Sequence, residues 1–414
     1  MNRPAKLTLE TRAEPLGDAF DLLAAYRPPG LHFERRGLGV AGSIGHPMVS
    51  FESEDIAALS AVVDVLRTAN GDRAVPFAAG AIAFGGDRPH YELVVPRRSV
   101  RRDLGGRTWR VDTNVPGEPG EEPPPFDRIA GGAPHEPFRD VQITEVPTSE
   151  GYVRAVASAV DRLRGTELRK VVLARTVEVD AGRRLDARAL VHRLRAVDPD
   201  AYTFAAPTDD GVIVGASPEL LVSRQGREVR SNPLAGSAPR SGDPDEDRAN
   251  ADTLAASSKD REEHVIVVEA VAETLGPFCE DMTWDPEPVL RETPNVWHLS
   301  TMFRGVLRDP APSALDLVAA LHPTPAVAGT PTEIALAAIL ELEPFDRGRY
   351  AGPVGWVDAN GDGEWAVALR CAELRGSRAI LYAGAGIVAD SVPERELAET
   401  EPKFRAFLDA LRWG

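Results

Sequence analysis

Three charged residues stand in sequence contexts where they could perform acid–base chemistry or bind an anion. Lys170 opens the apolar segment VVLA, Glu219 follows a Ser-Pro pair in GASPELL, and Arg370 interrupts AVALRCAEL. A lysine acts as a general base when its pKa is lowered, and a glutamic acid acts as a general acid when its pKa is raised. The arginine fork suits a carboxylate. Taken alone, each residue is more often an ordinary surface charge.

A second group of charges lies in two segments with helical character. Glu263 is part of SSKDREEHVIVVEAV, and Glu396, Glu399 and Lys403 are spaced i, i+3 and i+7. That spacing puts the last three on one face of a helix. Charged helix faces of this kind are usually solvated. A functional interpretation therefore needs evidence that other segments accompany them.

A glycine-rich segment, YAGAGIVADS, precedes the acidic helix. Gly384-Ala385-Gly386 with a later acid is compatible with the phosphate-binding turn of a dinucleotide fold. That turn belongs to a strand–helix–strand unit of about thirty residues, whereas only a short helix follows Gly386 in the sequence. A nicotinamide oxidoreductase is therefore the weaker interpretation, and NADH retained by the purified protein would be the evidence for it.

Composition excludes several classes of protein. The 414-residue chain is 43% hydrophobic, which is ample for a core, and its net charge of −17 argues against nucleic acid or an anionic membrane as partner. With only Cys279 and Cys371, neither a disulfide framework nor a structural zinc site is expected. There is no apolar segment of membrane-spanning length and no signal-peptide core near the N-terminus. We expect a soluble, cytoplasmic protein.

The predicted elements mix strands and helices. Helices are expected over 148–165, with Ser149 as N-cap, and over 251–276 and 331–343. Residues 352–388 read as a three-strand meander with tight turns, which join antiparallel strands. This mixture predicts an α+β fold with antiparallel sheets. Further strands are expected within 75–86, 91–96, 170–179, 201–207, 211–226 and 296–307.

The order of the motifs gives the charged residues a common context. Along residues 145–410 the chain contains, in order, RKVVLAR, GASPELL, NPLAGSAPR, KDREEH, WHLSTMFRG, LHPTPAVAG, LEPFDRGRYAGPVGW, GEWAVALRCAEL and YAGAGIVADS. In this order the motifs closely resemble those of the chorismate-utilising enzymes. The resemblance implies one large α+β unit, in which antiparallel sheets pack face to face, helices flank them and the site lies in a cleft.

The resemblance also implies how the chain is divided. Residues 145–414 would form the chorismate-binding catalytic region, and residues 1–144, which match weakly, would contribute to the same fold. We interpret the Pro/Gly-rich stretch at 115–140 as an excursion from that fold and not as a boundary between domains.

Residue roles follow from the same resemblance. Lys170 would be the general base and Glu219 the general acid of an isomerisation of chorismate. Mg²⁺ would be held by Glu263 and Glu399, with Glu396 nearby, and would offset the charge of the anionic substrate. The residues expected to bind substrate are Gly236, Ser237, His298, Ala326, Tyr350, Arg370, Gly384 and Lys403.

Two positions favour one reaction within the family. Amine-transferring relatives commonly lack the lysine at position 170, so its presence favours water as nucleophile, and no glutaminase subunit is expected. Salicylate synthases resemble one another in carrying threonine where this chain has Ala326. We therefore expect a monomeric isochorismate synthase, with salicylate synthase as the alternative. A non-catalytic binding protein of the same fold is disfavoured by the intact set of charged residues. The product could serve a catechol siderophore, menaquinone or salicylate.

Overall fold

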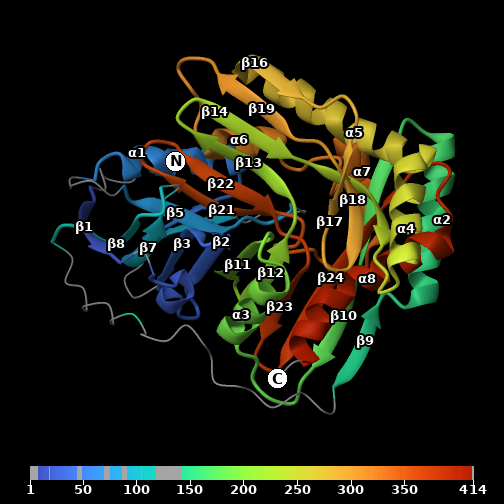
Figure 1. Cartoon of the computed structure of the whole chain (residues 1–414), viewed down its shortest axis with the longest axis horizontal. Helices are drawn as coiled ribbons and strands as arrows, with labels where there is room; N and C mark the ends of the chain where they lie inside the picture. The colour runs from blue at the N-terminus through green and yellow to red at the C-terminus, as the bar shows by residue number, and fades with distance from the viewer. Residues whose placement is uncertain are drawn as a thin grey trace.

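In the computed structural model, the described residues are 8–17, 19–43, 49–69, 75–85, 91–103, 105–117, 126 and 141–412. Most of the excursion expected at 115–140 therefore lies outside the described residues. The structure is an α+β fold with antiparallel sheets and flanking helices, as the sequence predicts (Figure 1). No helix within the described ranges is both long enough and apolar enough to cross a membrane.

The largest sheet combines strands from distant parts of the chain. β10 and β24 pair from Val171 against Ile387 to Asp180 against Arg378, and this long ladder is its most continuous part. β2 pairs with β11, which joins the N-terminal strands to the rest. In order across the sheet, the strands are β1 (Glu10–Leu16), β8 (Thr108–Asn114), β7 (Arg98–Arg102), β3 (Leu38–Ser43), β2 (Leu31–Arg35), β11 (Tyr202–Pro207), β12 (Val212–Ser217), β23 (Cys371–Arg375), β24 (Arg378–Ile387), β10 (Lys170–Asp180) and β20 (Gly329–Thr330), with β9 (Gln142–Val146) also paired to β10.

A second large sheet packs against the first. Phe33 and Phe204 of the first sheet belong to the same buried cluster as Phe77 and Trp365 of the second, so the main core lies between the two sheets. This is the face-to-face packing that the family resemblance implies. In order, the strands of the second sheet are β16 (Cys279–Trp284), β19 (Phe303–Leu307), β14 (Glu228–Asn232), β13 (Leu220–Gln225), β22 (Gly363–Val367), β21 (Pro353–Asp358), β5 (Phe77–Ala81), β6 (Tyr91–Val95) and β4 (Val49–Ser53).

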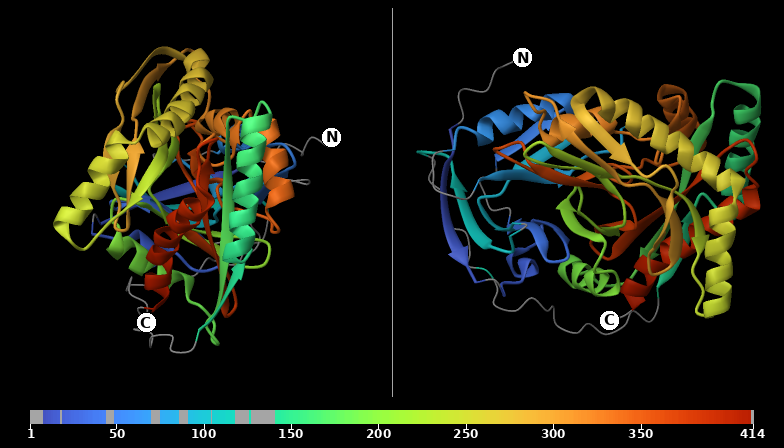
Figure 2. Two further views of the ribbon diagram at one scale, coloured as in Figure 1. Left: turned by 90° about the vertical axis from the view of Figure 1, so that its right-hand side faces the viewer. Right: turned by 45° about the horizontal axis from the view of Figure 1, so that its top comes forward.

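A small third sheet and most of the long helices complete the fold. Helices α2, α4 and α8 lie at the end of the molecule away from strands β1 and β8 (Figures 1 and 2), and α8 packs on β24. The third sheet has the order β15 (Leu234–Pro239), β18 (Val296–Ser300), β17 (Val289–Glu292). The helices are α1 (Ala61–Leu66), α2 (Ser149–Gly165), α3 (Ala187–Val197), α4 (Pro244–Ala256), α5 (Ser258–Leu275), α6 (Ala314–Leu321), α7 (Thr332–Leu342) and α8 (Pro393–Arg412), with short 3₁₀ turns at Leu22–Ala25, Ile56–Ser60 and Gly276–Phe278.

Three segments predicted as continuous strands or as one meander instead cross between sheets. Residues 211–226 form β12 in the first sheet and β13 in the second, and residues 296–307 form β18 in the third and β19 in the second. The expected three-strand meander at 352–388 has four strands: β21 and β22 belong to the second sheet, β23 and β24 to the first. Period-2 patterning identifies strands but not the sheet to which each belongs, which is why the sequence prediction was wrong here.

Two helix boundaries also differ from the prediction. The N-cap of α2 is Thr148, whose hydroxyl accepts a hydrogen bond from the Gly151 N–H at 3.2 Å, and not Ser149. The helix expected over 251–276 is two helices, because Ser257 leaves the helical conformation and caps α5 by accepting from the Asp260 N–H. Both features follow from side-chain capping, which favours serine and threonine at the start of a helix.

Candidate active site

One cavity brings most of the predicted site residues together. It has a volume of about 80 Å³ and is bounded by β10, β24, β15, β18, α5 and α8. Lys170 and Glu396 are the two predicted site residues that do not line it. The other eleven do: Glu219, Gly236, Ser237, Glu263, His298, Ala326, Tyr350, Arg370, Gly384, Glu399 and Lys403.

Lys170 lies in the layer behind the cavity wall. It is the first residue of β10, its side chain is fully buried, and its Nζ lies 3.1 Å from Oε1 of Glu263, which does line the cavity. The Glu263 carboxylate reaches Lys170 across Gly386, where a Cβ atom would lie only 2.0 Å from Glu263 Oε1. A glycine at 386 is therefore required by close approach of a carboxylate. This contact accounts for one of the two glycines in YAGAGIVADS.

Glu219 lies where the chain crosses from β12 to β13. Its side chain is buried, its backbone N–H donates a hydrogen bond to Ser217 Oγ, and its backbone carbonyl accepts one from the Val367 N–H. Burial raises the pKa of Glu219 to about 8, although the Leu234 N–H, Lys170 and Arg291 act in the opposite direction. The carboxyl group is therefore protonated at neutral pH and can donate a proton into the cavity.

Arg370 lies at the second crossing, between β22 and β23. Its Nη2 lies 3.0 Å from Nε2 of His298. Burial, followed by Arg370 and Lys403, lowers the pKa of His298 well below its usual value, so the imidazole is neutral and Nε2 accepts this hydrogen bond. Burial lowers the pKa of Arg370 to about 10, which leaves the guanidinium charged at neutral pH. A half-buried arginine at the wall of a cavity is suited to an anionic group of a substrate.

Backbone strain concentrates at this cavity. Gly236, Ala351 and Arg370 line it and have φ angles of 76°, 63° and 51°. Within the described residues, Arg36 is the only other residue besides glycine with positive φ. Residues other than glycine adopt this conformation at a cost of about 1–3 kcal/mol. The strained backbone at Ala351 and Arg370 is explained if these turns must present particular groups to the cavity.

Tyr350 and Lys403 form the wall on the side of β24. The Tyr350 ring stacks on Tyr382 with centroids 5.0 Å apart, and its hydroxyl lies close to Gly384, where a Cβ would be 3.2 Å away. Lys403 Nζ donates to the Gly384 carbonyl at 2.8 Å and to Glu399 Oε1 at 2.7 Å. α8 is therefore tied to β24 beside the glycine segment.

The acids of α8 are paired with lysines. Burial, followed by the neighbouring Glu399, raises the pKa of Glu396 to about 7, and Lys259 opposes this through a hydrogen bond of 2.6 Å. Burial disfavours ionisation of Glu399, but Lys403 and Lys259 outweigh it and lower the pKa of Glu399. Glu396 and Lys259 line a second cavity of about 510 Å³, which shares Ser237 and Glu399 with the first.

A family model for chorismate binding enzymes matches residues 130–412 of the chain. The chain belongs to the chorismate-binding enzyme family. It is 48% identical to the isochorismate synthase DhbC of Bacillus subtilis over 276 residues, which cover 65% of this chain and 69% of that protein. It is 42% identical to the isochorismate synthase EntC of Escherichia coli K12 over 270 residues, covering 65% of this chain and 69% of EntC.

Solved structures extend the similarity to nearly the whole chain. DhbC from Bacillus anthracis superposes with a TM-score of 0.81 at 38% identity, covering 95% of this chain and 99% of that one. MenF, the menaquinone-specific isochorismate synthase of Escherichia coli, superposes with a TM-score of 0.79 at 25% identity, covering 99% and 96%. Both likenesses include the N-terminal strands that the motifs do not cover.

The residues of this family member fit a Mg²⁺ ion in ligand type. Glu263 and Glu399 present carboxylate oxygens to one cavity, and Glu396 lies beside Glu399. Gly386 leaves the space that Glu263 occupies. No group of three His, Cys, Asp or Glu residues in the described part of the chain is close enough to hold a metal by itself. Mg²⁺ commonly takes one or two protein carboxylates, with water and substrate as the remaining ligands.

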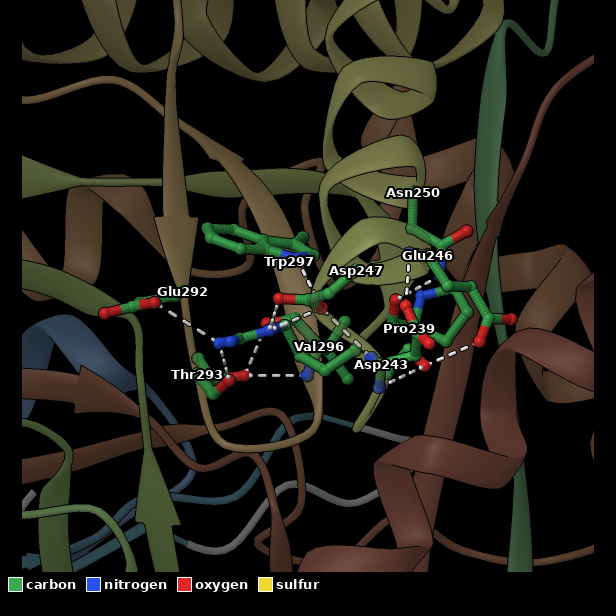
Figure 3. Close-up of polar contacts among 11 residues, drawn as sticks. Pro239, Asp243, Glu246, Asp247, Asn250, Glu292, Thr293, Val296 and Trp297 are labelled. Atoms are coloured by element: carbon green, nitrogen blue, oxygen red, sulfur yellow. Dashed lines mark hydrogen bonds and ion pairs between the residues drawn. The ribbon is translucent and has the colours of Figure 1, made fainter.

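Sequence reasoning missed the residues that support the cavity from outside. Lys259 precedes Glu263 by one helical turn in KDREEH and bonds Glu396, and the i, i+4 spacing was a usable signal. A second example is the cluster that joins α4 to the third sheet. Asp247 accepts hydrogen bonds from Arg240 and from the Trp297 indole, and Trp297 directly precedes His298 (Figure 3). Its partners come from separate segments, so sequence spacing gives no signal for it.

Proposed function

We propose that this member of the chorismate-binding enzyme family is an isochorismate synthase. In this reaction water adds at C2 of chorismate while the hydroxyl at C4 leaves. The enzyme is then an isomerase, because the water that enters replaces the one that departs. The observation that carries the proposal is a buried carboxylic acid of pKa about 8, Glu219, in one cavity with half-buried Arg370 and beside the buried Lys170–Glu263 pair.

The chemistry of each step falls to a group with suitable properties. Glu219 donates its proton to the leaving hydroxyl, since it is protonated at neutral pH. Lys170 takes a proton from the attacking water, which requires that its ammonium group first lose a proton and that its contact with Glu263 loosen. General acids and bases of this kind each contribute about 10²–10⁴-fold to the rate.

The two substrate carboxylates have separate binding groups in this proposal. Arg370, with Tyr350 and Lys403, holds the enolpyruvyl carboxylate, because the charged guanidinium is fixed by His298 and lines the cavity. The Gly236 backbone N–H and the Ser237 hydroxyl hold the ring carboxylate. The left-handed φ of Gly236 supports its role, because it allows the turn in β15 to face the cavity.

Mg²⁺ is the proposed cofactor. Glu263 and Glu399 would hold it, with Glu396 nearby, and the ion would neutralise the ring carboxylate and fix its orientation. Each of these three acids forms an ion pair with a lysine: Lys170, Lys259 or Lys403. These pairs indicate where a chain of net charge −17 needs positive charge.

The relatives named isochorismate synthase support this choice of reaction over others in the family. Ala326 lines the cavity and offers no hydroxyl there, whereas a threonine would. Names among the relatives refer to both siderophore and menaquinone pathways, such as the vibriobactin-specific enzyme of Vibrio cholerae and MenF of Escherichia coli. A cytoplasmic monomer that needs no glutaminase subunit remains a prediction.

The proposal is tested by product analysis. The purified protein is incubated with chorismate and Mg²⁺, and isochorismate, salicylate and pyruvate are quantified by mass spectrometry. We expect isochorismate with pyruvate at background. Salicylate with stoichiometric pyruvate would show a salicylate synthase instead, and unchanged chorismate would refute both. The Ala326→Thr variant should release more pyruvate than the wild type if the small side chain limits the reaction to isochorismate.

A further inference from the structure

A buried ion pair outside the cavity joins three segments that form its walls. Arg347 and Glu343 have exposed fractions of 2% and 8%, and neither lines the cavity. Arg347 Nε donates to Glu343 Oε2 at 2.8 Å and Nη2 donates to Oε1 at 2.5 Å. The pair lies between α7 and β21 in sequence and has no part in the proposed chemistry.

Both members of the pair also bond the backbone of β10. Arg347 Nη2 donates to the Val172 carbonyl at 2.8 Å, and Glu343 Oε1 accepts from the Ala174 N–H at 2.7 Å. On this edge β10 pairs with β20 only at Lys170 and Val171, and with β9 only from Thr176 onward. The ion pair therefore occupies the gap between two strands and replaces the missing ladder hydrogen bonds.

The gap exists because the chain before β20 turns away from β10. Val327 N–H and Ala328 N–H both bond the Thr324 carbonyl, which curls residues 324–328 and leaves Ala326 facing the cavity. Arg347 Nη1 donates to the Val327 carbonyl at 2.8 Å. One guanidinium thus bridges this turn and β10, whose first residue is Lys170.

The opposite side of the pair is fixed as well. The Arg347 guanidinium lies 4.4 Å from the centroid of the Phe84 ring, and its backbone carbonyl accepts from the Tyr350 N–H at 2.9 Å. Tyr350 lines the cavity. The planar fork, with donors on the Val172 and Val327 carbonyls, holds two walls in one geometry, which an ammonium group could not do, and the Arg347 backbone joins the third.

We propose that the Glu343–Arg347 pair is a positioning element that sets the distance between the Ala326 turn and β10, and thereby the partition between isochorismate and pyruvate-releasing turnover. This inference rests on the proposed function. Because the turn and the strand are connected through one side chain, a change in its geometry displaces Ala326 relative to the reacting ring. Displacements of this kind, far from the chemistry, can lower turnover by about 100-fold.

The test compares Arg347→Lys with a matched variant of another pair. Lysine keeps the charge beside Glu343 but cannot bond Glu343, Val172 and Val327 with one rigid fork. We expect a folded protein whose kcat falls by about 10–100-fold, with little change in KM and a higher ratio of pyruvate to isochorismate. Arg101→Lys is the control, because Arg101 forms a 2.8 Å ion pair with buried Asp358 and neither residue lines the cavity.

The control should lose stability without a change in product ratio. An unchanged ratio and kcat in folded Arg347→Lys, or equal changes in Arg101→Lys, would overturn the inference. If Arg347→Lys does not fold, the double variant Glu343→Leu/Arg347→Met replaces the ion pair by apolar groups, which is often tolerated in a core. That variant should also show the altered ratio, and a ratio like that of the wild type would overturn the inference. Failure of the wild type to convert chorismate would instead refute the proposed function.

Discussion

At the scale of single residues, the site depends on groups held in protonation states that water would not favour. Glu219 is kept as a neutral acid by burial, and His298 as a neutral base by burial and two cations. The residue types and motifs were visible in the sequence, and so was the need for a raised pKa at Glu219. Burial of Lys170 behind Glu263 was not, because it depends on Gly386 lying opposite them in a strand more than a hundred residues away.

The first prediction concerns Glu219 as the acid. Glu219→Gln cannot protonate a leaving group, so kcat should fall by about 10²–10⁴-fold while KM changes little. In the wild type, kcat/KM should decline as pH rises above about 8, where Glu219 loses its proton. Steady-state pH profiles of both proteins check this. An effect on KM alone would make Glu219 a binding residue.

The same group makes a prediction for stability. The pKa of Glu219 is about 8 when folded, against an ordinary 4.5, so the native state holds a proton that the unfolded state releases between these values. Its contribution to the free energy of unfolding is therefore full below pH 4.5 and is lost as pH rises to about 8. Glu219→Gln removes this dependence and should be more stable than the wild type above pH 8 in urea unfolding.

The second prediction concerns the metal. A chelator should abolish turnover and added Mg²⁺ should restore it, and Glu399→Gln should weaken binding of Mn²⁺, followed by electron paramagnetic resonance. Glu394→Gln is the control, because Glu394 is an exposed acid on the same helix. Full turnover in excess chelator, or equal Mn²⁺ binding by both variants, would contradict the assignment.

At the scale of elements, functional residues lie where strands pass from one sheet to another. Glu219 lies between β12 and β13, and Arg370 lies between β22 and β23. These strands were predicted from the sequence, but β12 with β13 and β22 with β23 were each predicted as one strand, because apolar alternation continues through each crossing. The backbone at Arg370 has a positive φ at this crossing, and the residue type gave no indication of it.

The third prediction tests the corrected start of α2. Thr148 accepts the capping hydrogen bond, whereas the Ser149 hydroxyl only donates to exposed Glu145. Thr148→Ala should lower the free energy of unfolding by about 1 kcal/mol, and Ser149→Ala should lower it less. Neither should alter kcat, because α2 does not line the cavity. Chemical denaturation of both variants measures the difference. A larger loss of unfolding free energy in Ser149→Ala would show that Ser149 is the N-cap, as the sequence predicted.

At the scale of the whole molecule, strands from residues 1–144 pair within both large sheets, as β2 with β11 and β5 with β21. This supports our proposal that the N-terminal portion and residues 145–414 form one unit. The α+β class and antiparallel sheets were predictable from turns and strand patterns. The pairing of the N-terminal strands was not, because it depends on contacts between distant segments that periodicity does not encode. The net charge of −17 likewise gives no indication of the three lysines gathered around the acids of the site.

In the proposed reaction, water activated by Lys170 attacks chorismate. Its most direct test is turnover in ¹⁸O-labelled water with wild type and Lys170→Gln, followed by mass spectrometry. We expect labelled isochorismate from the wild type and a fall of about 10²–10⁴-fold in the variant. With high ammonia the variant should form some aminated product, because an amine needs no base. Unlabelled isochorismate from the wild type, or labelled product at an undiminished rate from Lys170→Gln, would contradict it.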